Sequence, residues 1–335
     1  MNVLVIGGNL FIGRLLVAEL LKAGHDVSVL HRKPKHDLGK RVQNLVADRN
    51  DPEAVKAALE YSDFQVVFDN VYDWERGTSA AQVEGTVRAV LGASKDRLQR
   101  YVFMSSIAAY GDGLNHHEGD PLAPDDHSEA YVRNKAMTER MLFRLHQRTG
   151  FPVVTFRPPY IYGPENPFYR EAFFWDRLRD DRPIILPGDG HRLMQFVYVK
   201  DLVQAMIRSI DEPGAVGEAF NAANDRAVTQ SELIQALAAA AGKKANIVRV
   251  PRDRILEAGG NPMGTPSYFG VYYDMTPITE VVAKAKRVLG FQPVPFDKGL
   301  KESYRWYTRN RKRVKIDYAF EDKLLTMAAT APAAD

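Results

Sequence analysis

Tyr131 and Lys135 are the residues of this sequence whose types and spacing most directly indicate chemistry. They lie four positions apart in a helical pattern at 128–146, so both side chains fall on one face of the expected helix. A lysine ammonium lowers the pKa of a neighbouring phenol, which can then exchange a proton with a substrate near neutral pH. Ser106 ends the preceding expected strand, and its hydroxyl can polarise the same substrate oxygen. A pair of this spacing arises by chance about once in such a chain, so the added serine is what favours acid–base catalysis.

A glycine-rich turn, Gly7-Gly8-Asn9-Leu10-Phe11-Ile12-Gly13, joins the first expected strand to the first expected helix. Backbone N–H groups at such a helix start, together with the helix dipole, bind phosphate groups. Because the turn follows the first strand of an alternating pattern, it occupies the usual position of a dinucleotide site. Leu10 stands where a third glycine is common, so we interpret the turn as a divergent form of that site.

Arg32 and Lys33 follow the second expected strand, where an acidic residue often holds the adenosine ribose of NAD. Basic side chains at this place suit the 2′-phosphate of NADP instead. We therefore expect NADP(H), with NAD(H) as the alternative if both residues only end a solvated loop. Asp48 follows the third expected strand and can accept from the adenine amino group or cap the next helix.

Short apolar segments alternate with helical patterns through the first half of the chain. The expected strands are 3–6, 27–30, 44–47, 65–69, 101–104 and 153–157, and the expected helices are 10–23, 52–59, 79–91 and 128–146. This alternation predicts right-handed crossovers and a parallel sheet covered by helices on both faces. The predicted fold class is α/β, a doubly wound parallel sheet (Rossmann) with a smaller C-terminal substrate lobe.

Frequent proline and glycine residues after Arg157 indicate a change from the sheet to a lobe of loops and short helices. The expected parts are a dinucleotide-binding domain at 1–165, strands near 196–200 and 219–222 that return to its sheet, a mainly substrate-binding lobe at 166–317, and a tail at 318–335. The small and polar end of that tail, 327–335, is predicted to be disordered.

Composition narrows the class of protein. The chain has 335 residues, a net charge of +3 and no cysteine, which excludes disulfides, thiolate metal ligands and cysteine nucleophiles. The small charge does not indicate nucleic acid, and no apolar run approaches the length of a membrane span. We expect a cytoplasmic protein without a metal site. The adjacent His116, His117 and Glu118 lie in an expected loop, where bordering the substrate cleft is favoured over binding an ion.

Several further segments belong to the same pattern. They are Asp48-Arg49, Gly85-Thr86, Ser105-Ser106 with Tyr110-Gly111, 157–164, 187–190 and 196–201. Together with the glycine turn and the tyrosine–lysine pair, they resemble the extended short-chain dehydrogenases/reductases, the NAD-dependent epimerase/dehydratase family, over roughly residues 1–307. The form of the turn and the segment 173–177 resemble a divergent branch that includes the chloroplast stem-loop-binding proteins.

The resemblance implies a role for each matching residue. Tyr131 would be the acid/base, Lys135 would tune it and hold the nicotinamide ribose, and Ser106 would assist. The expected cofactor contacts are Gly7, Asn9, Leu10, Phe11, Ile12, Gly13, Arg32, Lys33, Asp48, Arg49, Asn70, Ser105, Pro158 and Tyr160. The expected substrate contacts are Tyr72, His116, Arg157, Phe168, Trp175, Met194 and Tyr268. Relatives often form homodimers through the helices here near 79–91 and 128–146.

The expected function is NAD(P)-dependent hydride transfer at a secondary hydroxyl or carbonyl of a sugar-like or nucleotide-sugar substrate, by an epimerase, dehydratase or reductase. Sugar-nucleotide relatives often carry Arg-Asp-Phe where this chain has Met194-Gln195-Phe196, which argues against a nucleotide sugar. One alternative is RNA binding on the same fold through 304–315, where aromatic and basic residues interleave. We favour an amphipathic helix there. The other alternative, an NADP sensor without turnover, requires an inactive tyrosine–lysine pair, and this pair is intact.

Overall fold

A seven-stranded parallel sheet forms the centre of the computed structural model, which describes residues 1–94 and 97–330. Its order is β12-β7-β5-β4-β1-β2-β3. The strands are β1 (Asn2–Ile6), β2 (Asp26–His31), β3 (Gln43–Val46), β4 (Val66–Asp69), β5 (Arg100–Met104), β7 (Val153–Arg157) and β12 (Glu218–Asn221). Strand order reverses between β1 and β4, so the glycine turn opens at the topological switch point, where ligands bind in such sheets.

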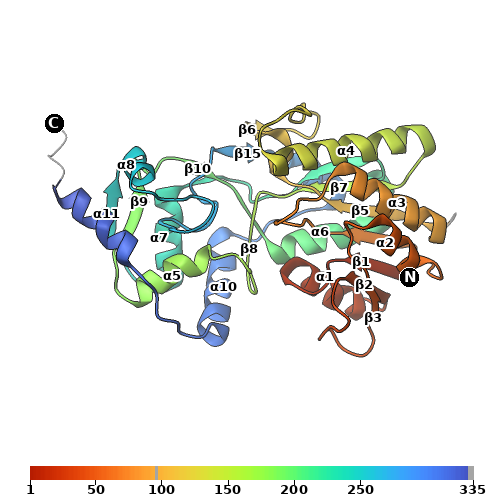
Figure 1. The fold of residues 1–335 in the computed structure, drawn as a ribbon, viewed down its shortest axis with the longest axis horizontal. Coiled ribbons are helices and arrows are strands. Elements are labelled where there is room, and N and C mark those ends of the chain that lie inside the picture. The colour runs from red at the N-terminus through yellow and green to blue at the C-terminus, as the bar shows by residue number, and fades with distance from the viewer. Residues whose placement is uncertain (95–96, 331–335) are drawn as a thin grey trace.

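Helices cover both faces of the sheet (Figure 1). One face carries α1 (Phe11–Lys22), α6 (Val199–Asp211) and α9 (Ala283–Leu289), and the other carries α2 (Pro52–Leu59), α3 (Ala80–Ser94) and α4 (Ala130–Thr149). Alternate residues of each strand divide between the two cores: Val3 and Val5 pack toward α1, whereas Leu4 and Ile6 pack toward α2 and α3. The predicted doubly wound α/β fold is confirmed.

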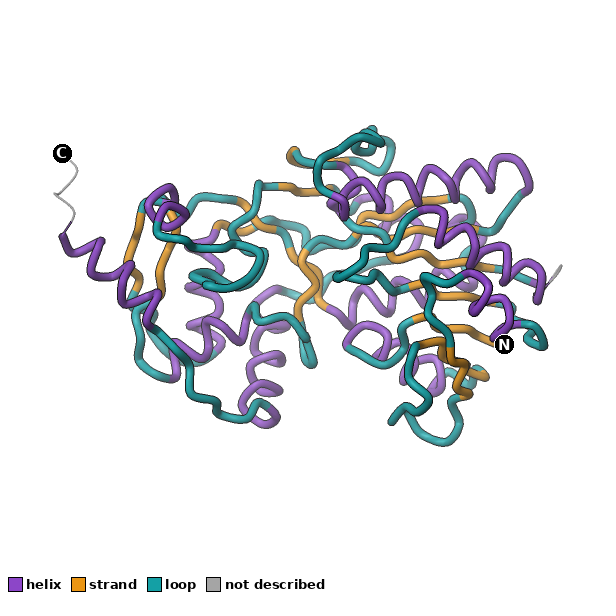
Figure 2. The backbone as a smooth tube through the Cα atoms, in the orientation of Figure 1, coloured by secondary structure: helices purple, strands orange, loops and turns teal. Residues whose placement is uncertain are grey.

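A second lobe lies beside the carboxyl ends of the sheet strands (Figures 1 and 2). Its elements are α5 (Glu171–Arg179), β9 (Ile184–Pro187), α7 (Gln230–Ala240), β14 (Ile247–Val250), α8 (Arg252–Glu257), α10 (Phe296–Asn310) and α11 (Ala319–Thr330). Phe173, Phe174 and Leu237 belong to its separate apolar core. Thr229 caps α7 by a reciprocal capping box with Glu232, which satisfies two orphan N–H groups.

Short ladders connect the two lobes. They pair β8 (Tyr160–Tyr162) with β11 (Phe196–Tyr198), β10 (Leu193–Met194) with β13 (Val228–Thr229), and β6 (Gly113–His116) with β15 (Ile278–Glu280). The remaining elements are the 3₁₀ turns η2 (Ile107–Tyr110) and η3 (Pro213–Ala215). The ladders bring segments far apart in the sequence to the region between the lobes.

Two expectations about elements were wrong. Of the two returning strands, β12 joins the main sheet beside β7, but β11 pairs with β8 outside it. Because β12 occupies the free edge of β7, no edge is left there for β11. The tail is also helical as far as Thr330, since Leu324 of α11 is fully buried against the lobe. Residues 331–335 lie outside the described part of the chain.

Within residues 1–94 and 97–330, no helix has both the length and the apolar character that a membrane crossing requires. The same residues contain no group of three or more histidine, cysteine, aspartate or glutamate side chains arranged to hold a metal ion.

Candidate active site

The tyrosine–lysine pair lies on α4, next to the carboxyl ends of the central strands β4 and β5. Lys135 is buried, and its Nζ donates to the carbonyl oxygen of Met104 at 2.6 Å. The same nitrogen lies 5.8 Å from the centroid of the Tyr131 ring. The Ser106 side chain hydrogen-bonds with the Tyr131 hydroxyl. The structure therefore brings together the three residues for which acid–base chemistry was predicted.

Aromatic side chains from the segment after β4 cover Tyr131. The ring of Trp74 stacks on the Tyr131 ring with 4.8 Å between centroids and an interplanar angle of 24°. Tyr72 meets Tyr131 edge to face, also at 4.8 Å, and its hydroxyl accepts from the Asn134 side chain at 3.2 Å. Phe168 contacts Trp74 from the second lobe at 5.9 Å. Of the predicted substrate contacts, Tyr72 therefore lies against Tyr131, and Phe168 lies against the ring stacked on it.

Burial shifts the two titrating groups in opposite directions. Burial raises the pKa of Tyr131 to about 12, and the Ser106 hydrogen bond only partly offsets this. Burial also lowers the pKa of Lys135 to about 8, because an ammonium loses hydration in this position. The expectation that Lys135 holds the pKa of Tyr131 below its usual value is therefore wrong in this conformation.

The glycine turn is too tightly packed for larger residues. Gly7 has φ of +86°, and a Cβ there would lie 2.3 Å from Val71 Cγ2. A Cβ on Gly13 would lie 1.9 Å from the carbonyl oxygen of Gly7, so only glycine lets α1 start this close to the turn. Leu10 is 70% exposed and precedes the first residue of α1. The turn leaves the first N–H groups of α1 available to a phosphate.

Unpaired polar atoms beside the turn fit a cofactor. Asn9 Oδ1 and both polar side-chain atoms of Asn70 are buried, and none has a hydrogen-bond partner in the described structure. Asn9 Nδ2 does bond to His31 Nδ1 at 2.7 Å. Buried polar groups are normally paired, so these atoms indicate a missing ligand with donors and acceptors. A dinucleotide between the turn and the end of β4 would satisfy them.

A cluster of charged residues joins the end of β2 to the segment after β4. The Arg32 side chain is 64% exposed, and its guanidinium lies 3.5 Å from Asp73. Arg76 pairs with both Asp73 and Asp48 at 2.7 Å. Backbone N–H donation from Arg76 holds the pKa of Asp73 below its usual value. Arg32 and Asp48, both expected near the adenosine end, are therefore connected by ion pairs to the chain segment that carries Trp74.

Some expected cofactor contacts have other partners. Arg49 is buried in an ion pair with Asp69, which also accepts from the Tyr101 hydroxyl. Ser105 donates to the buried Glu139 on α4. The Ser105 hydroxyl is therefore engaged with α4, whereas Arg49 Nε and Nη1 are buried without a hydrogen-bond partner among the described residues. Tyr160 donates to the Tyr272 carbonyl oxygen, and Pro158 accepts from the N–H of Ile107.

Other expected substrate contacts are buried away from Tyr131. Trp175 packs in the core of the second lobe and donates to the Leu237 carbonyl oxygen. Met194 belongs to the same core. Arg157 is buried in an ion pair with Glu139. The structure therefore brings none of these three side chains to Tyr131, because each packs in a core or pairs with a buried partner.

Tyr268 and His116 are engaged as well. Tyr268 is fully enclosed and donates to Asp274. His116 stacks on Tyr110 with 4.3 Å between ring centroids and contacts Asp120. Tyr268 therefore lies enclosed in the second lobe, and His116 lies at the end of β6, which pairs with β15, rather than beside Tyr131.

A sequence model of the NAD dependent epimerase/dehydratase family matches residues 3–223. The chain belongs to this family. The match begins at β1 and ends just after β12, so it contains the whole sheet and the tyrosine–lysine pair. Membership makes the protein an enzyme of the NAD-dependent epimerase/dehydratase class, as the resemblance implied, and makes a nicotinamide dinucleotide its cofactor.

Individual relatives agree with the family. Chloroplast stem-loop binding protein of 41 kDa b from Arabidopsis thaliana is 30% identical over 97% of this chain and 84% of its own length. The dTDP-D-glucose 4,6-dehydratase of Homo sapiens is 27% identical over 68% of this chain and 62% of its own. The solved structure of epimerase Mth375 from Methanothermobacter thermautotrophicus has a TM-score of 0.74 at 22% identity and covers 92% of both chains. The last likeness concerns the fold.

Three side chains at the site were not anticipated. Trp74 and Tyr272 stack with 6.0 Å between centroids, and Arg170 lies against the Tyr272 ring. The run Tyr72-Asp73-Trp74 after a strand was a usable signal, since aromatic residues are uncommon in exposed loops. Arg170 and Tyr272 gave no such signal, because they are a hundred residues apart and meet only in the fold.

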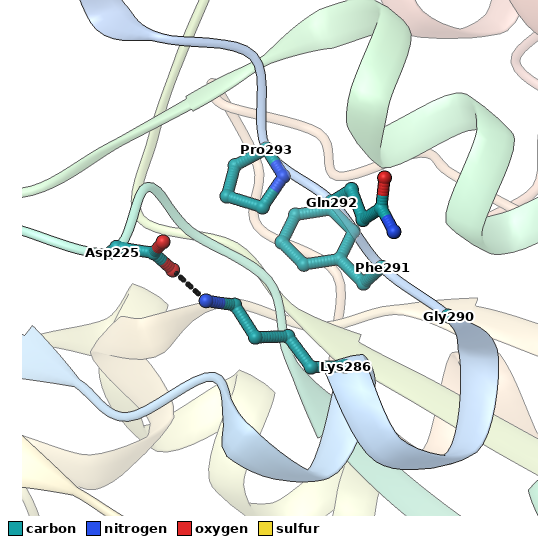
Figure 3. A pocket seen from close by; sticks show the side chains of 6 residues that line it. All are labelled: Asp225, Lys286, Gly290, Phe291, Gln292 and Pro293. Atoms are coloured by element: carbon teal, nitrogen blue, oxygen red, sulfur yellow. Dashed lines mark ion pairs between the residues drawn. The ribbon is translucent and has the colours of Figure 1, made fainter.

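A surface hollow of about 310 Å³ lies elsewhere. It is lined by the residues labelled in Figure 3: Asp225, Lys286, Gly290, Phe291, Gln292 and Pro293. Lys286 and Asp225 form an ion pair across it at 2.5 Å. None of these residues contacts Tyr131, Lys135 or the glycine turn, so the hollow is separate from the candidate active site.

Proposed function

We propose that the protein catalyses NAD(P)-dependent hydride transfer at a secondary hydroxyl or carbonyl carbon of a sugar-like substrate. The observation that carries this proposal is the hydrogen-bonded Ser106–Tyr131 pair beside the buried Lys135. This pair lies at the carboxyl ends of the sheet strands, where the glycine turn also lies. Acid–base groups and a dinucleotide site at one edge of a sheet support oxidoreduction rather than hydrolysis.

Each residue has a distinct task in this proposal. When bound, the nicotinamide supplies hydride transfer to or from the substrate carbon. Tyr131 gives or takes the proton of the substrate oxygen, and Ser106 orients that oxygen by a second hydrogen bond. Lys135 is held by Met104 so that its charge lies under the Tyr131 ring. The aromatic rings over Tyr131 exclude water from the reacting oxygen.

The relatives support a nucleotide sugar as one substrate class. Besides the dTDP-D-glucose 4,6-dehydratase, they include UDP-N-acetyl-alpha-D-glucosaminuronate decarboxylase from Bacillus cytotoxicus, 24% identical over 91% of this chain. Met194 stands where sugar-nucleotide relatives often carry the arginine that holds the substrate diphosphate, so a diphosphate would need a different contact in this protein. Met194 is buried in the core of the second lobe, and the next residue, Gln195, hydrogen-bonds the backbone of Asn224 and Glu280.

NADP(H) is the preferred cofactor in this proposal. Arg32 is exposed at the end of β2 beside Lys33, and its guanidinium would bind the 2′-phosphate of NADP there. Arg32→Ala is expected to weaken NADPH binding about tenfold to a hundredfold and to leave NADH binding within about twofold. Fluorescence titration with both nucleotides measures this. Equal losses for the two nucleotides would show that Arg32 does not read the 2′-phosphate.

A cytoplasmic location is part of the proposal and rests on the lack of cysteine.

A homodimer that forms through α3 and α4 is also part of the proposal. The two helices lie side by side on one face of the sheet. Sedimentation equilibrium of the full chain is expected to give twice the chain mass of 37.7 kDa. A single-chain mass at micromolar concentration would exclude the dimer.

RNA binding remains the second candidate function, favoured by the 30% identity to a chloroplast stem-loop binding protein. The segment 304–315 supports it less than its composition suggested. Tyr304 and Tyr307 pack on Trp175, and Arg311 pairs with the buried Asp176. These contacts match the amphipathic helix that the sequence favoured. RNA affinity that falls steeply with salt would support this function.

Cofactor analysis tests the proposed function. The protein is purified without added nucleotide, and its absorbance and mass spectrum identify what it retains. Retained NAD⁺ supports an epimerase or dehydratase, which returns the hydride, whereas weak and reversible NADPH binding supports a reductase. Absence of binding by either nucleotide at millimolar concentration would refute the proposal.

A further inference from the structure

Arg170 is a buried cation at the junction of the two lobes. Only 9% of the residue is exposed. It immediately precedes α5, and its Nε donates to the backbone carbonyl oxygen of Val271 at 3.2 Å. This single bond fixes the direction of the guanidinium and leaves its two terminal nitrogens free.

Aromatic rings enclose the guanidinium. Its central carbon lies 4.4 Å from the centroid of the Phe168 ring and 5.3 Å from that of Tyr160. Tyr272 and Tyr273 follow at 5.8 and 5.6 Å. Rings stabilise a cation through their faces but accept no strong N–H hydrogen bond. The N–H groups in the guanidinium plane therefore remain available to a planar oxyanion.

No described carboxylate lies close enough to Arg170 to form an ion pair. Among the described residues, none forms an ion pair with Arg170 within 4.0 Å, and none accepts from its terminal nitrogens. The adjacent Glu171 accepts instead from the Tyr273 hydroxyl at 2.6 Å and from the Asn166 side chain at 2.9 Å. Burial raises the pKa of Glu171, and the nearby Arg170 charge partly offsets this rise. An enclosed guanidinium without an ion-pair partner is costly, and an oxyanion bound to it would offset that cost.

The aromatic rings around Arg170 adjoin Tyr131. Two of these rings, Phe168 and Tyr272, contact Trp74 at 5.9 and 6.0 Å between centroids. Trp74 in turn stacks on Tyr131. The positive charge of Arg170 acts on the Tyr131 hydroxyl and favours its ionised form. A substrate that reacts at Tyr131 would extend along these rings toward Arg170.

We propose that Arg170 binds an oxyanion, a carboxylate or phosphate, carried by the substrate whose hydroxyl or carbonyl reacts at Tyr131. The substrate class is thus an acidic or phosphorylated sugar rather than a neutral one. The inference rests on the proposed function in taking Tyr131 as the reacting group. Arg170 determines specificity here and takes no part in proton transfer.

The test uses three sugars with the same ring and different groups on carbon 6: D-glucuronate, D-glucose 6-phosphate and D-glucose. Calorimetric titration of the full chain, with and without NADP⁺, gives their dissociation constants. At least one anionic sugar is expected to bind about tenfold to a hundredfold more tightly than glucose, as charged hydrogen bonds do. The stronger of the two identifies carboxylate or phosphate as the group recognised.

Variants assign the preference to Arg170. Arg170→Gln is expected to reduce the affinity for the anionic sugar to that for glucose, and Arg170→Lys to restore it in part. If Arg170→Gln does not fold, a weaker preference in Arg170→Lys than in the wild type supports the proposal, and an unchanged preference overturns it. The matched control is Arg254→Gln, which removes an exposed lobe arginine paired with Glu257 and should change nothing.

Two results would overturn the proposal. One is that neither anionic sugar binds more tightly than glucose, and the other is that Arg170→Gln keeps the full preference of the wild type. Failure of the proposed function would look different: no nicotinamide would bind and no turnover would occur, while the anion preference measured without cofactor stayed dependent on Arg170.

Discussion

Burial raises the pKa of Tyr131 and lowers the pKa of Lys135, so both groups carry a proton over a different pH range than in water. With a pKa of about 12, Tyr131 keeps its proton at neutral pH, and with a pKa of about 8, Lys135 is still mostly charged there. The site in this conformation can therefore donate a proton from Tyr131 but does not readily accept one. Acting as a base requires that some of the rings over Tyr131 move away or that positive charge approaches its hydroxyl.

The buried lysine should make folding stability depend on pH. Its pKa is 10.5 in the unfolded chain and about 8 in the fold, so the ammonium costs more in the folded state. Relative to Lys135→Met, the wild type should lose about 3 kcal/mol as pH falls from 10.5 to 8. Urea unfolding of both proteins across this range measures the difference. A difference that is constant with pH would mean that Lys135 titrates normally.

Residue types predicted the catalytic trio but not which neighbours face it. Ser106 and Ser105 have the same chemistry, yet only one points at Tyr131 because strand residues alternate sides. Arg49 looked like an adenine contact, and its burial with Asp69 depends on strand neighbours far away in the sequence. Such pairings arise from packing and leave no local signal.

At the scale of elements, the segment at 70–79 is the part that connects the cofactor end to the catalytic tyrosine. Asp73 pairs with Arg76 and lies near Arg32, and the next residue, Trp74, stacks on Tyr131. Trp74 is nevertheless 52% exposed, so its position depends on the segment rather than on burial. Changes in these ion pairs should therefore alter how the Trp74 ring stacks on Tyr131.

Removing the stacked ring should change the titration of the tyrosine. Trp74→Ala exposes the Tyr131 ring to water, so its pKa should fall from about 12 toward the usual 10.0. Ultraviolet difference titration, with Tyr131→Phe in the same background as reference, measures this pKa. Trp306→Ala on α10 is the control and should leave it unchanged. An unaltered pKa in Trp74→Ala would show that Trp74 does not bury Tyr131.

Periodic elements were predictable and short ladders were not. The helix at 52–59 and the strand at 153–157 match α2 and β7 to the residue, because apolar periodicity and a proline start define them. Strands of two to four residues such as β10 and β6 carry too little periodicity to detect. The helix α11 was missed because its small residues resemble a polar tail, and only the buried face around Leu324 reveals it.

At the scale of the whole molecule, α11 holds the second lobe together. Glu321 of this helix forms a buried ion pair with Arg177 of α5, and both side chains are almost fully enclosed. The next residue, Asp322, pairs with Arg182 but is 56% exposed. The two adjacent pairs differ mainly in burial, which makes them a natural comparison.

Breaking the buried pair should destabilise the protein far more than breaking the exposed one. Glu321→Gln leaves the Arg177 charge buried without its partner and should lower the free energy of unfolding by about 3 kcal/mol. Asp322→Asn should cost less than about 1 kcal/mol, because water screens the pair. Urea denaturation followed by circular dichroism measures both. Similar losses for the two variants would refute the assigned role of burial.

The central claim is that Tyr131 exchanges the proton of a sugar-like substrate. The most direct measurement is product formation by the wild type and Tyr131→Phe on UDP- and dTDP-linked hexoses and hexuronic acids, with nicotinamide affinity measured in parallel. We predict that the variant turns over about 10²- to 10⁴-fold more slowly than the wild type while binding the nicotinamide equally well. Wild-type turnover in the variant would contradict the account.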